Sequence, residues 1–136
     1  MLSDNAINLS KARLNIAKER IIVAEQNLEL GYYTTVANRA YYAAFSAMRA
    51  VLALQGFDSK KHSGVIAKFR QDYIATETLP KDLSPIINQL TKIRQGSDYD
   101  DFYFISKEEV TKQLQDAKKF VETVEQYLLT QYEQNI

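Results

Sequence analysis

The sequence predicts an all-α fold, an up-and-down bundle of four main helices with a short fifth helix. Three observations predict it. Only four glycines and two prolines occur in 136 residues, so few residues suit the many turns of a sheet protein. Apolar residues recur at intervals of three and four along most of the chain, as on one face of a helix. No run of alternating polar and apolar residues indicates a strand. The length suits a single helical domain over residues 1–136.

The first helix is expected from about residue 4 to residue 30. Ser3 or Asp4 can cap its start, and Gly31 is placed to end it. Its apolar residues follow the helical period, at Ile7, Leu14, Ala17, Ile21, Ala24 and Leu28.

The second helix is expected over residues 34–55, with Gly56 at its end. Most of its circumference is apolar, which is typical of a central helix packed on most sides. Its polar side chains fall within one sector about 100° wide, formed by Thr35, Asn38, Arg39, Tyr42, Ser46 and Arg49. Arginines in such a stripe can bind phosphate or carboxylate with two parallel hydrogen bonds.

Two further helices are expected between residues 62 and 96. After a loop at residues 57–61, a short helix carries Val65, Ile66, Phe69 and Tyr73. The fourth helix follows a connection at residues 76–81, tolerates Pro85 in its first turn, and should fray near Gly96. Its apolar set is Ile86, Ile87, Leu90 and Ile93.

An acidic and aromatic loop at residues 97–105 precedes the last helix. Ser106 and Glu109 fit a capping box that starts it. The helix then shows a narrow apolar seam that suits an antiparallel bundle or a partner helix, made by Val110, Leu114, Ala117, Val121, Val124 and Leu128.

Composition excludes several classes of protein. Seventeen basic and seventeen acidic residues cancel, so no general nucleic-acid footprint is present, although a local basic cleft is compatible with this balance. The absence of cysteine excludes disulfides and thiolate sites. No stretch approaches the roughly 20 apolar residues of a membrane span, and residues 1–10 lack a signal-peptide pattern, so we expect a cytoplasmic protein without membrane contact. Phosphate-loop and zinc motifs are missing, and Asp98, Asp100 and Asp101 lack calcium-loop spacing, so no metal or cofactor is expected.

Three segments occur in the order found in HEPN domains. They are NRAYYAAF at residues 38–45, KHSGVI at residues 61–66 and RQGSDY at residues 94–99. The chain therefore resembles the HEPN family over about residues 17–129, and is most similar to its small stand-alone prokaryotic branch. That resemblance implies a five-helix bundle that forms a homodimer.

The resemblance also implies a function. Many HEPN proteins are metal-independent ribonucleases whose fourth helix ends in an arginine, followed four to six residues later by a histidine. Two such motifs meet across the dimer and form a cleft. Many are encoded beside a minimal nucleotidyltransferase, as toxin to its antitoxin, and in some pairs that partner attaches a nucleotide to a tyrosine near the motif. The implied partners are thus a second copy, a nucleotidyltransferase, and RNA or a nucleotide.

Arg94 stands where the family's arginine belongs, but no histidine follows it. The chain resembles an Arg-x-x-x-Asp-Tyr variant, here Arg94, Asp98 and Tyr99. Metal-free RNA cleavage needs a group that exchanges a proton near neutral pH, for which histidine is suited. An aspartate is ordinarily charged and repels phosphate, and a tyrosine hydroxyl has an ordinary pKa of about 10. The only histidine, His62, can replace the missing one if the fold brings it to Arg94; otherwise it caps a helix or bonds a backbone carbonyl.

Each remaining candidate has a structural and a functional interpretation. Arg94 and Asp98, four residues apart, can form a salt bridge or line a cleft. In the second-helix stripe, Arg39, Tyr42 and Arg49 can bind phosphate, or the arginines can lie at the bundle surface or pair with residues 98–101.

The two loop tyrosines, Tyr99 and Tyr103, can cover the core, stack on a base or accept a nucleotide. Three functions follow from these alternatives. The first is the partner of a minimal nucleotidyltransferase in a toxin–antitoxin type module, with nucleotide or RNA binding in a dimer cleft. The second is a metal-independent endoribonuclease toxin. The third is a non-catalytic helical scaffold whose arginines only make ion pairs.

Overall fold

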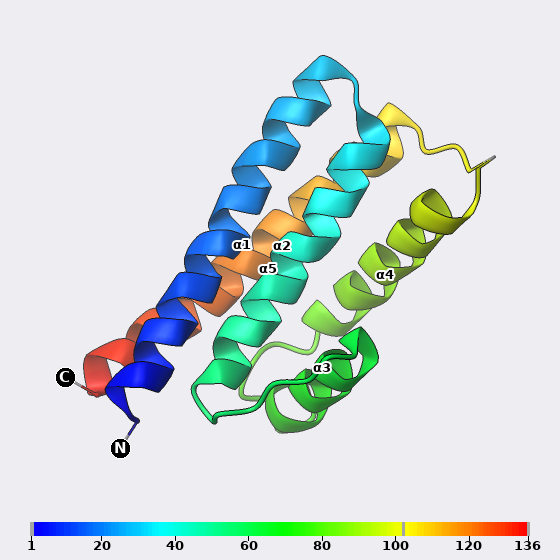
Figure 1. The fold of residues 1–136 in the computed structure, drawn as a ribbon. Helices are drawn as coiled ribbons and strands as arrows, with labels where there is room; N and C mark the ends of the chain where they lie inside the picture. Colours follow the sequence, from blue (N-terminus) through cyan, green and yellow to red (C-terminus); the bar gives the residue numbers. More distant parts are fainter. Residues whose placement is uncertain (1, 102, 136) are drawn as a thin grey trace.

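The computed structural model describes residues 2–101 and 103–135 and confirms the all-α prediction. Five α-helices and one π-helical turn follow one another, and the described residues contain no strand (Figure 1). They are α1 (Asp4–Leu30), α2 (Tyr33–Ala53), α3 (His62–Phe69), η1 (Arg70–Ile74), α4 (Leu83–Tyr99) and α5 (Lys107–Gln134).

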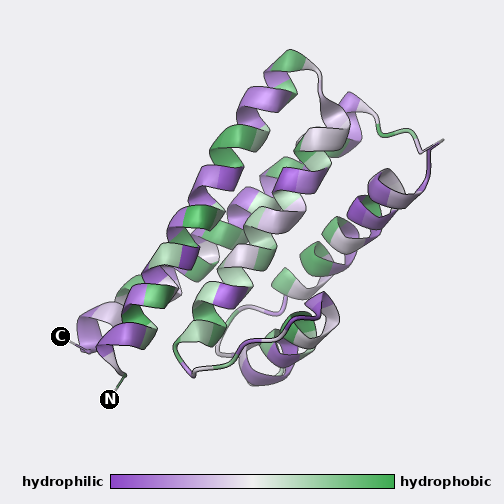
Figure 2. Cartoon of the chain, in the orientation of Figure 1, coloured by the Kyte–Doolittle hydropathy of each residue, from purple (hydrophilic) through white to green (hydrophobic). Residues whose placement is uncertain are grey.

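Helix α2 is the centre of the bundle, as its wide apolar arc predicts. It packs against α1, α5, α4 and α3. It is mostly white to green in Figure 2, whereas α1 alternates between purple and green along its length. Small residues on α2 are fully buried and let its neighbours approach closely, among them Ala40, Ala43, Ala47 and Ala50. Even so, none of the helices in the described part of the chain is long and apolar enough to cross a membrane.

The limits of α1 follow from its capping residues. The Ser3 hydroxyl accepts a hydrogen bond from the Ala6 N–H at 3.1 Å. Gly31 ends the helix in the left-handed conformation, with φ of 83°, which a residue with a Cβ rarely adopts. A hydrogen bond joins the segments before α1 and after α5: the Leu2 N–H donates to Asn135 Oδ1 at 3.0 Å.

The third helix differs from the prediction, because its last part, which contains Tyr73, is the π-helical turn η1. The Ala75 N–H reaches back five residues to the Arg70 carbonyl, at 2.8 Å. Tyr73 is nonetheless buried and stacks on Phe69, with 5.8 Å between ring centroids. The apolar pattern therefore predicted which side chains pack on the core, with Ile66 only partly buried, but not the local winding of the backbone.

The expectation that the fourth helix frays near Gly96 was wrong. Helix α4 continues through Gly96 to Tyr99, so residues 97–99 are helical rather than part of the loop. Gly96 serves a close contact instead: a Cβ there would lie 2.4 Å from Cε2 of Tyr103. The missing side chain makes room for the Tyr103 ring, which packs back on the helix end and the core.

The capping box of α5 is present as predicted. The Ser106 hydroxyl accepts from the Glu109 N–H at 3.0 Å, and Glu109 Oε1 accepts from the Ser106 N–H at 3.3 Å. Helix α5 then buries the predicted seam against α2 and α1.

Candidate functional site

Arg94 lies near the end of α4, on the side that faces α2. Its Nε donates to Asp98 Oδ2 at 3.1 Å, which is the ion pair that their spacing of four residues predicts. Its Nη2 donates to the hydroxyl of Tyr42 at 3.3 Å. Only 16% of the Arg94 side chain is exposed, so the guanidinium is held in one orientation by partners on two helices.

Three tyrosine rings surround this guanidinium. Its Cζ lies 5.0 Å from the ring centroid of Tyr41, 5.6 Å from that of Tyr42 and 5.8 Å from that of Tyr99. These distances fall within the range of cation–π attraction. Burial alone lowers the pKa of Arg94, but Tyr42, Tyr41, Tyr99 and Asp98 together outweigh it and raise that pKa. Arg94 is therefore a fixed, permanent cation.

The fold brings His62 into the same neighbourhood, although it lies on a different helix. Its Nδ1 is 3.0 Å from the hydroxyl of Tyr41, the residue whose ring also faces Arg94. The imidazole stacks on Phe45, with 4.2 Å between ring centroids. Tyr41 thus contacts both His62 and Arg94 and joins them into one cluster.

The surroundings keep His62 uncharged at neutral pH. Its pKa is lowered by burial first, and then by the positive charges of Arg94 and Arg49. Burial raises the pKa of Tyr41 to about 12, so its hydroxyl keeps its proton and can donate or accept. When the Nδ1–H of His62 donates to Tyr41, the other ring nitrogen, Nε2, is left able to accept a proton.

A pocket of about 480 Å³ opens beside these residues, between α2, α3 and α4. Its size falls within the roughly 300–1,000 Å³ typical of small-ligand sites. Tyr41, His62 and Arg94 line it, together with two further cations, Arg70 and Lys92. No aspartate or glutamate is among the lining residues, so the pocket suits an anion.

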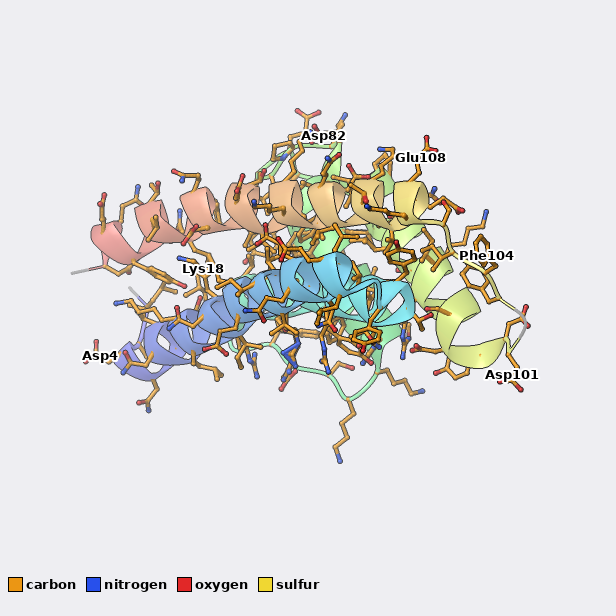
Figure 3. The ribbon with its side chains drawn as sticks, turned by 90° about the horizontal axis from the view of Figure 1, so that it is seen from above. Asp4, Lys18, Asp82, Asp101, Phe104 and Glu108 are labelled. Carbon is orange, nitrogen blue, oxygen red and sulfur yellow. The ribbon has the colours of Figure 1, made fainter. Side chains whose placement is uncertain are left out.

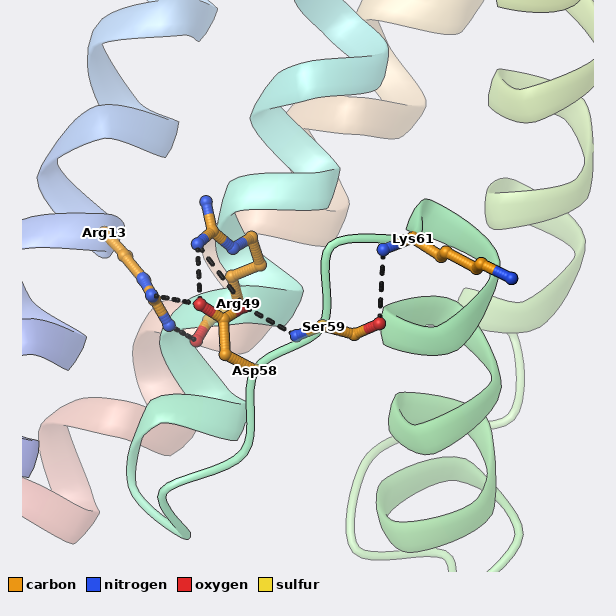
Figure 4. A network of polar contacts seen from close by, with 5 residues as sticks. All are labelled: Arg13, Arg49, Asp58, Ser59 and Lys61. Atoms are coloured by element: carbon orange, nitrogen blue, oxygen red, sulfur yellow. Dashed lines mark hydrogen bonds and ion pairs between the residues drawn. The ribbon is translucent and has the colours of Figure 1, made fainter.

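Arg49 belongs to a different cluster from the one predicted. Instead of pairing with residues 98–101, it lies 3.2 Å from Asp58, which also accepts from Arg13 at 3.2 Å (Figure 4). Asp58 Oδ1 accepts from the Ser59 N–H, and Ser59 Oγ accepts from the Lys61 N–H. Sequence spacing could not identify Asp58, because it lies in the loop that the fold brings back over α2.

This network fixes the loop that leads into His62. A Cβ on Gly64, in the first turn of α3, would lie 2.7 Å from Ser59 Oγ, so the loop and the helix are in close contact. Burial works to raise the pKa of Asp58, but the Ser59 N–H, Arg49 and Arg13 outweigh it and lower that pKa. Arg49 therefore acts on His62 through its charge and through the position of this loop.

The other candidates lie in less specific surroundings. Arg39 is partly buried on α2 and makes no hydrogen bond or ion pair with the described residues. Tyr103 packs on Gly96, which is the structural interpretation of that residue. Asp101 and Phe104 mark the loop between α4 and α5, and their side chains point away from the bundle (Figure 3). Within residues 2–101 and 103–135, no group of three or more metal-ligating side chains lies together.

Two residues in or beside the cluster are not among the predicted site residues. Tyr41 lies outside the predicted polar stripe of its helix, yet its hydroxyl bonds His62. Arg20, on α1, has its Cζ 5.9 Å from the ring centroid of Tyr42, and its buried Nε has no partner in the described part of the chain. The signal for Arg20 was a charged residue directly beside Ile21 on the buried face of the first helix.

Comparison with known proteins shows which family this chain belongs to. The sequence matches the HEPN domain family over residues 10–127. The chain belongs to the HEPN family. Among curated HEPN relatives, it is 33% identical over 113 residues to "Putative toxin MJ0142" of Methanocaldococcus jannaschii, covering 82% of this chain and 77% of that protein. It is 32% identical over 115 residues to a UPF0332 protein of Archaeoglobus fulgidus, covering 81% and 87% of the two chains.

A solved structure has the same fold. The crystal structure of TT1696 from Thermus thermophilus superposes with a TM-score of 0.74, covering 88% of this HEPN chain and 98% of that one. The sequence identity is 24%, so the likeness concerns the fold alone.

Proposed function

We propose that this HEPN protein is the toxin-type component of a two-protein module and that its Arg94 site binds a phosphate group of RNA or of a nucleotide. A minimal nucleotidyltransferase is the proposed second component. The orientation of Arg94 carries the proposal: Asp98 and Tyr42 hold Nε and Nη2, while Nη1 has no hydrogen-bond partner among the described residues. The word toxin in the names of two relatives, both from Methanocaldococcus jannaschii, supports the same class.

The site has the two features that a nucleotide ligand needs. A guanidinium held in place loses little conformational freedom when it binds phosphate, and its charge strengthens each hydrogen bond. Tyr99 is 75% exposed beside Arg94, so its ring is accessible to stack on a base.

The direct test is binding of a fluorescein-labelled single-stranded RNA to the purified protein, measured by fluorescence polarisation. Arg94→Gln removes the charge and should weaken binding at least about tenfold, since hydrogen bonds between charged groups are worth about 1.5–3 kcal/mol. Lys119→Gln is the matched control: Lys119 pairs with Asp82 on the surface and lies outside the pocket. Equal binding by wild type and Arg94→Gln would exclude Arg94 as the phosphate contact.

The proposed partners have their own test. We expect the purified protein to be a dimer by light scattering, and to co-purify with a nucleotidyltransferase encoded beside it when the two are expressed together. A monomer that does not bind such a protein would contradict this part of the proposal while leaving phosphate binding intact.

A second function, metal-independent RNA cleavage, is favoured by the position of His62. In this mechanism Nε2 of His62 takes the proton of a ribose 2′-hydroxyl, whose oxygen attacks the adjacent phosphorus. The bond to the 5′-oxygen breaks, which gives a 2′,3′-cyclic phosphate and, after protonation, a 5′-hydroxyl. Arg94 stabilises the negative charge that develops on the phosphoryl oxygens, and Asp98 orients Arg94.

Cleavage in the presence of EDTA tests this second function. His62→Asn and Arg94→Gln should each abolish the cyclic-phosphate product, whereas Lys119→Gln should cleave like the wild type. Cleavage that persists unchanged in Arg94→Gln would identify a contaminating nuclease.

A further inference from the structure

The pocket beside His62 has a second cation whose position is fixed without a carboxylate. Arg70 donates from Nη1 to Ser84 Oγ and from Nη2 to Asn88 Oδ1, the latter at 2.6 Å. Both partners are neutral, whereas Arg94 is paired with an aspartate. The Arg70 charge is therefore oriented by the fold but not neutralised by it.

Lys92 adds a second uncompensated charge to the same wall. It follows Asn88 by four residues, so the two lie one above the other on the face of α4 that lines the pocket. Lys92 makes no ion pair within the described residues. Arg70 is also the first residue of the π-helical turn, a feature that is frequent at functional sites.

The start of α3 adds to the positive potential at the pocket. No side chain caps this helix, whose first residues, His62 and Ser63, line the pocket. Uncapped N–H groups at a helix start favour an anion. Arg70, Lys92 and the uncapped start of α3 therefore each favour a bound anion, and no carboxylate lines the pocket.

We infer that this pocket contains a second phosphate subsite, in which Arg70 and Lys92 bind the phosphate next to the one bound by Arg94. The inference rests on the proposed function, because it presupposes that Arg94 binds phosphate. Asn88, which holds Arg70, and Arg94 are six residues apart, or about 9 Å along α4. Arg70 and Arg94 are therefore held at separate points along α4, which suits two phosphodiester-linked groups of one strand.

The test compares ligands with one and two phosphates as competitors of the labelled RNA. The probes are AMP, ADP and the dinucleotide pApA, which carries a terminal and an internucleotide phosphate. Wild type should bind pApA more tightly than AMP or ADP. Lys92→Gln should lower the pApA affinity about three- to tenfold and the AMP affinity by a smaller factor.

Two variants of Arg70 complete the test. Arg70→Gln should lower the pApA affinity like Lys92→Gln, and Arg70→Lys, which keeps the charge, should restore part of it. Because Arg70 also bonds Ser84 and Asn88, circular dichroism must verify that each variant is folded, and Lys92→Gln decides the question if Arg70→Gln is not.

The outcomes separate the two proposals. If Arg94→Gln weakens every ligand while Lys92→Gln weakens none, the second subsite is excluded and the proposed function stands. If Arg94→Gln weakens none, the proposed function itself fails. If ADP and pApA both bind more tightly than AMP by the same factor, the subsite suits a nucleoside polyphosphate, and the assignment to an RNA strand is wrong.

Discussion

Tyr41 is the residue that turns two separate candidates into one site. His62 and Arg94 lie on α3 and α4, and the hydroxyl and ring of Tyr41 contact one each. The charges of Arg94 and Arg49 help to lower the pKa of His62. The proposed base and the proposed phosphate-binding cation therefore line the same pocket, and both contact Tyr41.

The first prediction concerns the pKa of His62, which NMR can measure directly because the chain has one histidine. Its ring-proton titration should give a pKa below the ordinary value of about 6.5. Arg94→Gln and Arg49→Gln should each raise it, since each removes a positive charge. Saturating phosphate ligand should raise it too, because the anion offsets the same charges. A pKa at or above 6.5 in the free wild type would contradict the described surroundings.

The same shift predicts how stability depends on pH. Because the pKa of His62 is lower in the folded state, the unfolded state binds its proton more readily. The contribution of uncharged His62 to the free energy of unfolding is fully present above the unfolded pKa of about 6.5. It is lost as pH falls through the folded pKa. Thermal melts should therefore show His62→Asn losing less stability than wild type between pH 7 and pH 5. Parallel losses in the two proteins would show that His62 does not titrate abnormally.

Among the elements, the helices with capping residues at their ends were predicted accurately from the sequence. Ser3, Gly31 and the Ser106–Glu109 box act through neighbours in the chain, so local sequence is enough to place them. The end of α4 was not predictable, because Gly96 is required by Tyr103, whose position depends on the loop between them.

The contact between Gly96 and Tyr103 predicts that Gly96→Ala changes the free energy of unfolding in opposite directions in the wild type and in Tyr103→Ala. Gly96→Ala should destabilise the wild type by about 1–3 kcal/mol, because the new methyl group displaces the Tyr103 ring. In a Tyr103→Ala background the same change should be stabilising, by up to about 1 kcal/mol, from helix propensity alone. Urea unfolding of the four proteins measures this coupling. The same effect of Gly96→Ala in both backgrounds would show that the ring does not pack there.

The capping box of α5 gives a second prediction for an element. Ser106→Ala should cost about 1 kcal/mol of unfolding free energy, since the Glu109 N–H loses its acceptor. Thr111→Ala is a comparison within the same first turns, where the hydroxyl bonds only a helical carbonyl, and it should cost less. Chemical denaturation compares the two. Equal costs would indicate that the cap contributes nothing specific.

At the scale of the whole molecule, the fold class and the central place of α2 could be predicted from the sequence. Only some of the residues of the candidate site could be predicted in this way. The Arg94–Asp98 pair was predictable because both residues lie on one helix. The meeting of His62 with Arg94 was not, because it depends on a loop held by Asp58, Arg13 and Arg49. Arg70 gave no sequence signal, since its neutral partners come from the start of α4.

The net charge of zero predicts how the proposed RNA binding should depend on salt. Affinity must come from a few local cations, so the logarithm of the binding constant should fall with that of salt concentration with a slope of about −1.5 to −2. That corresponds to two or three phosphates at about −0.7 each for a single strand. Lys92→Gln should make the slope shallower by less than about 0.7, because Arg70 still contacts the same phosphate. A slope steeper than about −4 would indicate a much larger basic surface than this one.

The decisive experiment is growth after induced expression in a host that lacks any partner gene. Wild type and Lys119→Gln should arrest growth, and Arg94→Gln, expressed to the same soluble level, should not. If wild type and Arg94→Gln affect growth alike, whether both arrest it or neither does, Arg94 is not the functional centre of a toxin-type HEPN protein.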